Sequence, residues 1–239
     1  MVQPFRGGSA AHYQASLWPE LDIRFAVDHV SIEAGAPNFQ TLSNAPYRGG
    51  WGSGSRFVNW KVPLNYDCSD PSAMMRAELG RWGYDPAMVV GLQTAAHITH
   101  TSFAEETGDE FKLLVCSSAG TGNAARAGLH RETFSAYTPG TINIMVLVDG
   151  KMTDEAMVNA VISATEAKSA ALADLEVRDR SHDRIATGTS TDAVLIAVSQ
   201  SDQYSSIHRY AGSVTTIGNA IGRLVYETVH EAVRTQGEP

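Results

Sequence analysis

Three nearly uninterrupted apolar runs constrain the fold of this chain more than any other feature of its sequence. They occupy residues 111–118, 141–148 and 193–198, and each has the length of a single strand. A strand that alternates apolar and polar residues can leave one face in water, whereas a strand that is apolar throughout must be covered on both faces. We therefore expect these runs to lie at the buried centre of a sheet.

Weaker patterns predict further strands. Apolar and polar residues alternate over 21–33 and 55–63, and these stretches are bounded by Gly, Pro and Asn clusters. Residues 88–95 form another apolar segment, and the glycine-rich stretch 46–56 is expected to be a loop. Period-two alternation is typical of half-buried strands.

Helix signals occur at three places. The Asp-Pro pair at residues 70–71 supplies an N-cap and a proline for the first turn, and Gly83 ends the run that follows. Thr153 precedes two acidic residues and opens a helix that extends to about residue 175. Residues 213–234 predict a closing helix with one apolar side.

The order of these elements indicates the fold class. Strands dominate early and alternate with helices late, and the chain contains no repeat or linker. We predict an α+β fold, a single domain with a mixed, largely buried β-sheet covered by helices. Its 239 residues fit one large domain over 21–235, preceded by an N-terminal extension over 1–20.

Charge and composition exclude several classes of function. The formal net charge of −8 gives no basic surface for a phosphate backbone, so no nucleic-acid partner is expected. The longest charge-free run, residues 133–148, is too short and too polar for membrane insertion. Two cysteines make no disulfide framework, and no secretion signal opens the chain. We expect a cytoplasmic protein. The sequence does not decide between a monomer and a homo-oligomer.

Three polar, glycine-rich segments, residues 117–128, 139–143 and 186–193, each abut a buried strand. Glycines there let the backbone approach a ligand, and free N–H groups can bind an oxyanion. We expect the segments to share one pocket; the alternative is that they are ordinary tight turns. The predicted substrate-binding residues in them are Gly120, Thr121, Gly122, Asn123, Arg126, Thr141, Asn143, Thr187 and Gly188.

Two other patterns argue against a cofactor or a metal. Gly120, Gly122 and Ala125 fit a G-x-G-x-x-A fingerprint, but nearby glycine and proline leave no room for the helix of a dinucleotide site. His97 and His100 lie in a stretch that alternates like a strand, so we expect their side chains on opposite faces. We predict neither a cofactor nor a protein-bound metal.

Lys168 is unusual because it lies in the middle of the apolar face of the helix over 153–175. It is interpreted as a site residue that reaches toward the glycine-rich segments; the alternatives are that it snorkels to the edge of the core or forms a buried ion pair. Glu166 lies on the opposite face of that helix. Trp51, flanked by arginines, either stacks on a flat ligand or folds back into the protein.

Five motifs together resemble the adenosylcobinamide amidohydrolase family, CbiZ. They are TAAH at 94–97, GTGNAARAG at 120–128, GTINIMVL at 140–147, ATEAKSAAL at 164–172 and ATGTSTDAV at 186–194. The resemblance implies hydrolysis of the amide that joins aminopropanol to the corrin ring of adenosylcobinamide, giving adenosylcobyric acid. Cobalt would then arrive within the corrinoid substrate.

The roles expected for such chemistry follow from the residues themselves. Amide hydrolysis needs an activated nucleophile, stabilisation of the oxyanion and a proton for the departing amine. Asp192 or Glu166 would activate water, and Lys168 would stabilise negative charge or deliver the proton. Direct attack by Thr189 or Ser190 is the mechanistic alternative. The functional alternative is a non-catalytic corrinoid-binding or delivery protein, although the D-x-H-x-x-G signature of one such class is absent.

Overall fold

The computed structural model describes residues 1–239 except 9, 36–37, 64–68, 132–139 and 239. The helices are α1 (Pro71–Trp82), α2 (Asp154–Asp174) and α3 (Thr216–Thr235), with a short 3₁₀ helix at Ile98–His100. The strands are β1 (His12–Tyr13), β2 (Asp22–Phe25), β3 (His29–Glu33), β4 (Phe39–Ser43), β5 (Gly50–Gly54), β6 (Arg56–Lys61), β7 (Val89–Thr94), β8 (Ser102–Gly108), β9 (Phe111–Ala119), β10 (Ile142–Gly150), β11 (Arg178–Asp179), β12 (Arg184–Ile185) and β13 (Ala193–Val198).

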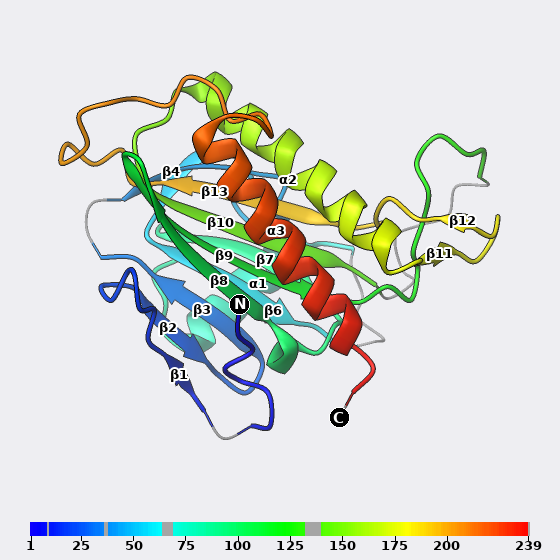
Figure 1. Cartoon of the computed structure of the whole chain (residues 1–239). Helices are drawn as coiled ribbons and strands as arrows, with labels where there is room; N and C mark the ends of the chain where they lie inside the picture. The colour runs from blue at the N-terminus through cyan, green and yellow to red at the C-terminus, as the bar shows by residue number, and fades with distance from the viewer. Residues whose placement is uncertain (9, 36–37, 64–68, 132–139, 239) are drawn as a thin grey trace.

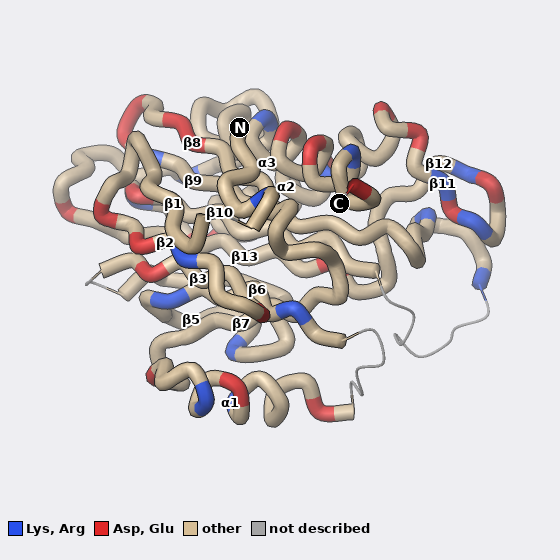
Figure 2. The backbone as a smooth tube through the Cα atoms, turned by 90° about the horizontal axis from the view of Figure 1, so that it is seen from below, with Lys and Arg blue, Asp and Glu red and all other residues tan. Residues whose placement is uncertain are grey.

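The elements form four layers. A six-stranded sheet in the order β5-β4-β13-β10-β9-β8 packs against a five-stranded sheet in the order β1-β2-β3-β6-β7. Helices α2 and α3 cover the outer face of the first sheet (Figure 1). Helix α1 covers the outer face of the second sheet, at the opposite side of the molecule (Figure 2). The predicted α+β class with mixed sheets and covering helices is confirmed, with two stacked sheets where one was expected.

The strand β10 lies at the centre of the six-stranded sheet, and all nine of its residues are buried. It pairs in parallel with β13 and antiparallel with β9, which are the other two apolar runs. Its side chains alternate between two cores: Ile144 and Val146 face α2 and α3, whereas Met145 and Leu147 face the second sheet. The sequence-based placement of these strands is therefore confirmed.

The helix ends follow the local sequence signals. The Asp70 side chain accepts a hydrogen bond from Ala73 N at 2.9 Å, and Gly83 closes α1 with φ = 72°, a conformation that glycine adopts without strain. Thr153 caps α2, and Thr215 caps α3, each through a side-chain bond to a backbone N–H. The three predicted helices are confirmed.

Two predicted segments differ from the structure. Residues 21–33 form a hairpin of β2 and β3 rather than one strand, with Val27 almost fully exposed at its turn. Alternation continues across this turn, so the pattern does not reveal it. Residues 50–54, expected in a loop, form β5 at the edge of the six-stranded sheet. An edge strand needs backbone pairing on one side only, so a glycine-rich sequence can supply it.

The first twenty residues, interpreted as an extension, pack onto the sheets. Phe5 and Ala15 are fully buried in the core between the two sheets, and Trp18 is 7% exposed there. Val2 also pairs with Phe103 in an isolated bridge next to β8. In the described part of the chain, no helix is long and apolar enough to cross a membrane.

Candidate active site

The three glycine-rich segments meet at one end of the six-stranded sheet. Gly120 N donates to Thr141 O at 2.9 Å, which joins the first segment to the second. Ala125 N donates to Gly188 O at 2.8 Å, which joins the first to the third. The carbonyl of Gly140 lies within hydrogen-bond distance of hydroxyls of the third segment. The three segments therefore lie side by side, whereas the pocket described below is lined by residues of the first two.

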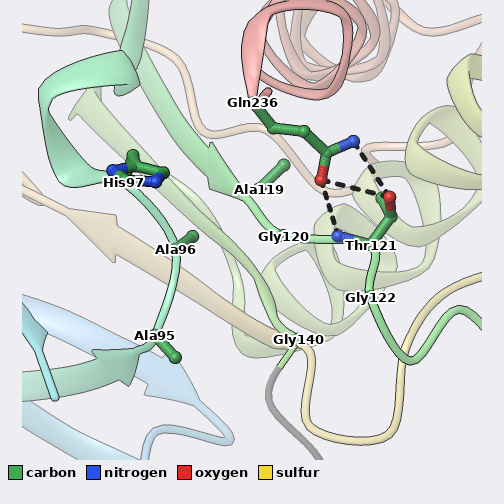
Figure 3. Close-up of a pocket in the computed structure, with 9 residues that line it drawn as sticks. All are labelled: Ala95, Ala96, His97, Ala119, Gly120, Thr121, Gly122, Gly140 and Gln236. Carbon is green, nitrogen blue, oxygen red and sulfur yellow. Dashed lines mark hydrogen bonds between the residues drawn. The ribbon is translucent and has the colours of Figure 1, made fainter. Parts of the chain in front are cut away.

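A small pocket of about 170 Å³ opens where the first two segments meet (Figure 3). Most of its wall is backbone and small side chains, which lets a ligand approach the main chain closely. Gln236, just after α3, closes one side, and its Oε1 accepts from Thr121 N at 2.8 Å. The residues around the pocket are Ala95, Ala96, His97, Ala119, Gly120, Thr121, Gly122, Gly140 and Gln236.

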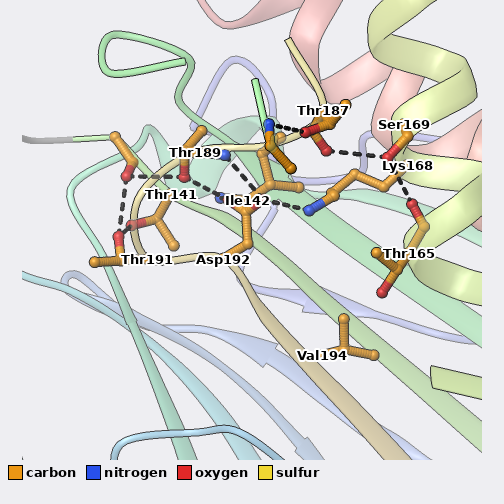
Figure 4. Close-up of polar contacts among 12 residues, drawn as sticks. Thr141, Ile142, Thr165, Lys168, Ser169, Thr187, Thr189, Thr191, Asp192 and Val194 are labelled. Atoms are coloured by element: carbon orange, nitrogen blue, oxygen red, sulfur yellow. Dashed lines mark hydrogen bonds and ion pairs between the residues drawn. The ribbon is translucent and has the colours of Figure 1, made fainter. Parts of the chain in front are cut away.

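A buried ion pair lies beside this pocket. Lys168 Nζ is 2.5 Å from Asp192 Oδ2, and the two side chains are only 8% and 11% exposed. Lys168 reaches from α2 toward Asp192 (Figure 4), and the small residues Ala164 and Ala171 of the same helix are also buried. Burial of two charges is costly unless further hydrogen bonds satisfy them. Lys168 therefore forms a buried ion pair, one of the alternatives expected from the sequence. Its partner Asp192 belongs to a glycine-rich segment, toward which Lys168 was expected to reach.

Asp192 also organises the backbone around it. Its Oδ1 accepts from Ile142 N and its Oδ2 accepts from Thr189 N, both at 3.0 Å. The Thr189 hydroxyl donates to Oδ1 as well. One carboxylate therefore fixes the start of β10 and the 186–193 segment against each other, while Lys168 balances its charge.

Gly188 makes room for the ion pair. A Cβ at this position would lie 2.4 Å from Asp192 Oδ2 and 2.7 Å from Lys168 Nζ. Real Cβ atoms do not approach polar atoms so closely, so any larger residue would displace one partner. A glycine is required here by the close approach of the ion pair to the backbone, rather than of a ligand.

Threonine hydroxyls surround the carbonyl of Gly140. The Oγ1 atoms of Thr191 and Thr189 lie 3.1 Å and 3.2 Å from Gly140 O. Thr141 Oγ1 lies 2.6 Å from Thr191 Oγ1, so these hydroxyls form one connected group (Figure 4). Thr187 belongs to a neighbouring contact, where its hydroxyl accepts from Ala127 N at 2.9 Å.

A buried polar row continues from Thr141 between the two sheets. Asn143 Nδ2 donates to Asn59 Oδ1 at 2.7 Å and to Gln93 O at 2.9 Å, and Asn59 Nδ2 donates to Ser118 Oγ at 2.8 Å. Asn143 is 2% exposed, yet its Oδ1 has no hydrogen-bond partner among the described residues. This amide oxygen is therefore free to accept a hydrogen bond from a group other than the described residues.

Three candidate residues lie outside the ion-pair cluster. Glu166 is exposed on α2, and its contact is with Ser213 Oγ at 3.3 Å. Trp51 is 48% exposed on the edge strand β5. Arg126 is exposed, and its guanidinium donates to Ile185 O at 2.9 Å.

The arginines beside Trp51 have partners of their own. Arg48 donates to backbone carbonyls, including Ser53 O at 3.1 Å, and Arg56 pairs with Glu33 and lies over the ring of Tyr84. Asn123, by contrast, joins the glycine-rich segments directly: its Nδ2 lies 2.6 Å from Ser190 Oγ.

The histidines at 97 and 100 do not follow the expected strand. They flank and end a 3₁₀ helix, and their rings lie 5.9 Å apart, edge to face, so the expectation of opposite faces is wrong. A single helical turn brings residues three apart together. Burial lowers the pKa of His100, and the nearby positive charges of Arg6 and His97 add to the shift. Within the described residues, no group of three His, Cys, Asp or Glu could hold a metal.

The described residues that follow Gly120, 121–131, contain turns and an isolated bridge but no helix. Cys116 lies between the sheets, where burial raises the pKa of its thiol to about 12. A thiol of this kind is inert as a nucleophile.

The sequence analysis missed Thr191 and Gln236 as parts of the site. Thr191 lies in a run of small polar residues, where the sequence does not distinguish the hydroxyl that faces the Gly140 carbonyl. Gln236 is separated from Thr121 by more than a hundred residues, and only the packing of α3 on the sheet brings them together. The available sequence signal for Thr191 as a site residue is its position between the candidate residues Thr189 and Asp192.

A family model and a curated relative carry the same description. The family model described as adenosylcobinamide amidohydrolase, CbiZ, matches residues 20–239. An adenosylcobinamide amidohydrolase of Methanosarcina mazei is 28% identical over 84% of this chain and 93% of its own length. The uncharacterized protein MJ1613 of Methanocaldococcus jannaschii is 31% identical over 66% of this chain and 68% of its own.

One solved structure is also similar in part. A β-aminopeptidase from a Burkholderia species aligns with 90% of this chain and 79% of its own, at 13% identity and a TM-score of 0.42.

Proposed function

The chain belongs to the adenosylcobinamide amidohydrolase family, CbiZ, and from this premise we propose that it hydrolyses the aminopropanol amide of adenosylcobinamide. The products are adenosylcobyric acid and aminopropanol, and the cobalt stays within the corrinoid. The name of the Methanosarcina relative, which is similar over most of both chains, supports the same reaction.

The observation that carries this proposal is the buried pair of Lys168 and Asp192 at the junction of the three glycine-rich segments. An amide becomes negatively charged at its oxygen as the nucleophile adds, and fixed donors and charges near that oxygen lower the barrier. Here a lysine, a carboxylate and several hydroxyls are held together beside a pocket with a backbone wall.

The size of the pocket favours one orientation of the substrate. Its volume of about 170 Å³ is below the roughly 300–1,000 Å³ of sites that enclose a whole drug-sized ligand. A corrin ring is larger than such ligands, so we infer that the pocket holds the amide arm with its aminopropanol end. The ring then lies at the mouth, and the scissile amide reaches the wall formed by Gly120 and Gly140.

The contacts of Asp192 support a narrower proposal for its role than the sequence alone does. Its oxygens are already bound by Lys168, two backbone N–H groups and the Thr189 hydroxyl. A carboxylate held in this way orients the hydroxyl beside it, while Lys168 supplies the positive charge. Glu166 has no part in this arrangement because it is exposed and contacts Ser213.

The test is turnover of adenosylcobinamide, followed by mass analysis, with Lys168→Met beside the unchanged protein. Release of aminopropanol supports the proposal, whereas intact, tightly bound adenosylcobinamide supports a corrinoid carrier. Lys151→Met is the matched control, because Lys151 pairs with the fully exposed Asp202 at 2.9 Å on the surface. The control is expected to keep full turnover.

A further inference from the structure

The peptide group between Gly140 and Thr141 lies at the centre of the hydroxyl cluster and lines the pocket on its glycine side. We propose that the chain cleaves this bond itself and that Thr141, freed as an N-terminal residue, is the nucleophile of the amide hydrolysis. The second half of this inference rests on the proposed function, whereas the first half does not.

Hydrogen bonds connect the Thr141 hydroxyl to the Gly140 carbonyl oxygen through the Thr191 hydroxyl. Thr141 Oγ1 is 2.6 Å from Thr191 Oγ1, and Thr191 Oγ1 is 3.1 Å from the oxygen of Gly140. Only Cβ, Cα and N separate the hydroxyl oxygen of a threonine from the carbonyl carbon that precedes it, so attack of Thr141 Oγ1 on the Gly140 carbonyl closes a five-membered ring. Thr191 can therefore accept the proton of the Thr141 hydroxyl and donate its own to the carbonyl oxygen.

A second hydroxyl lies near the same oxygen. Thr189 Oγ1 is 3.2 Å from Gly140 O, but its single proton goes to Asp192, which fixes its position. The donor to the Gly140 oxygen is therefore the Thr191 hydroxyl, which can stabilise negative charge as it develops there.

The backbone of Gly140 is suited to glycine alone. Its φ of 153° is one that side-chain-bearing residues rarely adopt, and a Cβ would lie 2.1 Å from Asn123 Oδ1. The carbonyl is thereby turned toward the hydroxyls of the 186–193 segment. Asp192 holds the other side of Thr141 in place through Ile142 N at 3.0 Å.

The reaction balances with water as the only co-reactant. Thr141 Oγ1 adds to the Gly140 carbonyl carbon, and Thr191 relays the proton to the carbonyl oxygen. The C–N bond then breaks, the proton passes to the nitrogen, and an ester joins Gly140 to Thr141 Oγ1. Water hydrolyses the ester, which leaves a carboxylate on Gly140 and a free α-amine and hydroxyl on Thr141.

The freed residue has the features of an activated nucleophile. An N-terminal α-amine can act as the base for the hydroxyl of the same residue. Asn143 follows two residues further along and is held between the sheets by bonds from its Nδ2 to Asn59 Oδ1 and Gln93 O, which fixes the strand just after Thr141. Gly140 lines the pocket, so the bond that breaks adjoins the proposed place of the substrate amide.

The test is the intact mass of the purified full-length protein under denaturing conditions. We expect two pieces, residues 1–140 and 141–239, whose summed mass exceeds that of the chain by one water. N-terminal sequencing of the second piece should begin Thr-Ile-Asn. Thr141→Ala is expected to stay in one piece, and Thr141→Ser to be cleaved.

Two further variants separate the relay from the fold. Thr191→Val is expected to slow cleavage roughly a hundredfold, which is typical when one oxyanion donor is removed. Thr165→Ala removes an exposed hydroxyl that bonds only within α2, at Val161 O, and should cleave like the unchanged protein. Thermal melting of Thr141→Ala reports whether that variant is folded. Cleavage of Thr141→Ser would show that the hydroxyl, and not the threonine methyl group, is what cleavage requires.

The same samples are then assayed with adenosylcobinamide. A single uncleaved chain overturns the inference, whether or not it is active; if it is active, the proposed function stands without self-cleavage. Cleaved protein that leaves adenosylcobinamide intact contradicts the proposed function but supports the cleavage. Cleaved, active protein whose Thr141→Ala variant is both uncleaved and inactive supports both.

Discussion

Lys168 Nζ and Asp192 Oδ2 lie 2.5 Å apart in a space that exists because residue 188 is a glycine. The lysine comes from a long helix on the outer face of the sheet, and the aspartate comes from the segment just before β13. Through Ile142 N the same aspartate fixes the start of β10. One ion pair thus couples the covering helix to the strand end that borders the pocket.

The substitution Lys168→Met tests this coupling. It keeps the length and the apolar stem but leaves the Asp192 carboxylate buried without its cation. We expect the free energy of unfolding to fall by about 3–5 kcal/mol, as when other buried pairs lose one partner. Urea unfolding measures the loss, and turnover of adenosylcobinamide, expected to be lost, is measured on the folded fraction.

The double variant Lys168→Met with Asp192→Asn serves as the control for unpaired charge. It should recover part of the lost stability because no ion is left without a partner. Unchanged stability and normal turnover in the single variant would contradict the role given to the pair.

Gly188→Ala should disturb the same pair by steric means. The new Cβ would lie 2.4 Å from Asp192 Oδ2, so either the carboxylate or the ammonium must move. We expect turnover to fall at least tenfold with a destabilisation of about 1–3 kcal/mol, the usual cost of overpacking. Kinetics and thermal melting check both.

Gly222→Ala is the matched control for that substitution. Gly222 lies within α3, and a Cβ there meets no atom within 4 Å. Alanine in a helix interior is about 0.5–1 kcal/mol more favourable than glycine, so this variant should be slightly more stable with unchanged turnover. Equal behaviour of the two alanine variants would refute the steric argument.

Of the two carboxylates that the sequence offers as activating groups, only Asp192 lies in the cluster. Glu166 is exposed on α2 and contacts Ser213, so we expect Glu166→Gln to keep full turnover. Asp192→Asn, by contrast, should lower turnover by roughly a hundredfold or more because the Thr189 hydroxyl loses its charged partner. If Glu166→Gln lost more turnover than Asp192→Asn, Glu166 rather than Asp192 would be the activating carboxylate.

Stability should depend on pH through His29. Its ring is 2% exposed and stacks on Trp82, and burial lowers its pKa although the contact with Asp28 acts in the other direction. The unfolded chain therefore binds the proton more tightly than the folded protein. Stability from this residue is complete well above about pH 6.5, the ordinary histidine pKa, and is lost as pH falls from there toward the lowered pKa.

Urea unfolding at pH 7.5, 6.5 and 5.5 measures this dependence. The slope attributable to one histidine cannot exceed about 1.4 kcal/mol per pH unit. His29→Gln should flatten the curve in this range, with the contribution of the buried His100 left in both proteins. An identical slope in the variant would show that His29 does not titrate as its burial requires.

The parts of the fold that follow local rules are predictable from the sequence. The cap at Asp70, the stop at Gly83 and the continuous apolar run of β10 each lie where the structure has them. Pairing between distant strands gives no local signal, so the stacking of two sheets and the edge strand β5 were missed.

The site shows the same division. The glycines that let the backbone approach could be found from composition and strand ends, and Lys168 could be found from its place on an apolar helix face. Thr191 could not be chosen among its polar neighbours because the backbone at 186–193, not the sequence pattern, turns its hydroxyl toward Gly140.

The most direct test of the proposed hydrolysis is the fate of the oxygen from water. Adenosylcobinamide is incubated with the protein in water enriched in ¹⁸O, and the products are analysed by mass. The account predicts adenosylcobyric acid with one ¹⁸O atom in its new carboxylate, together with unlabelled aminopropanol. Recovery of unlabelled, intact adenosylcobinamide bound to the protein would contradict it.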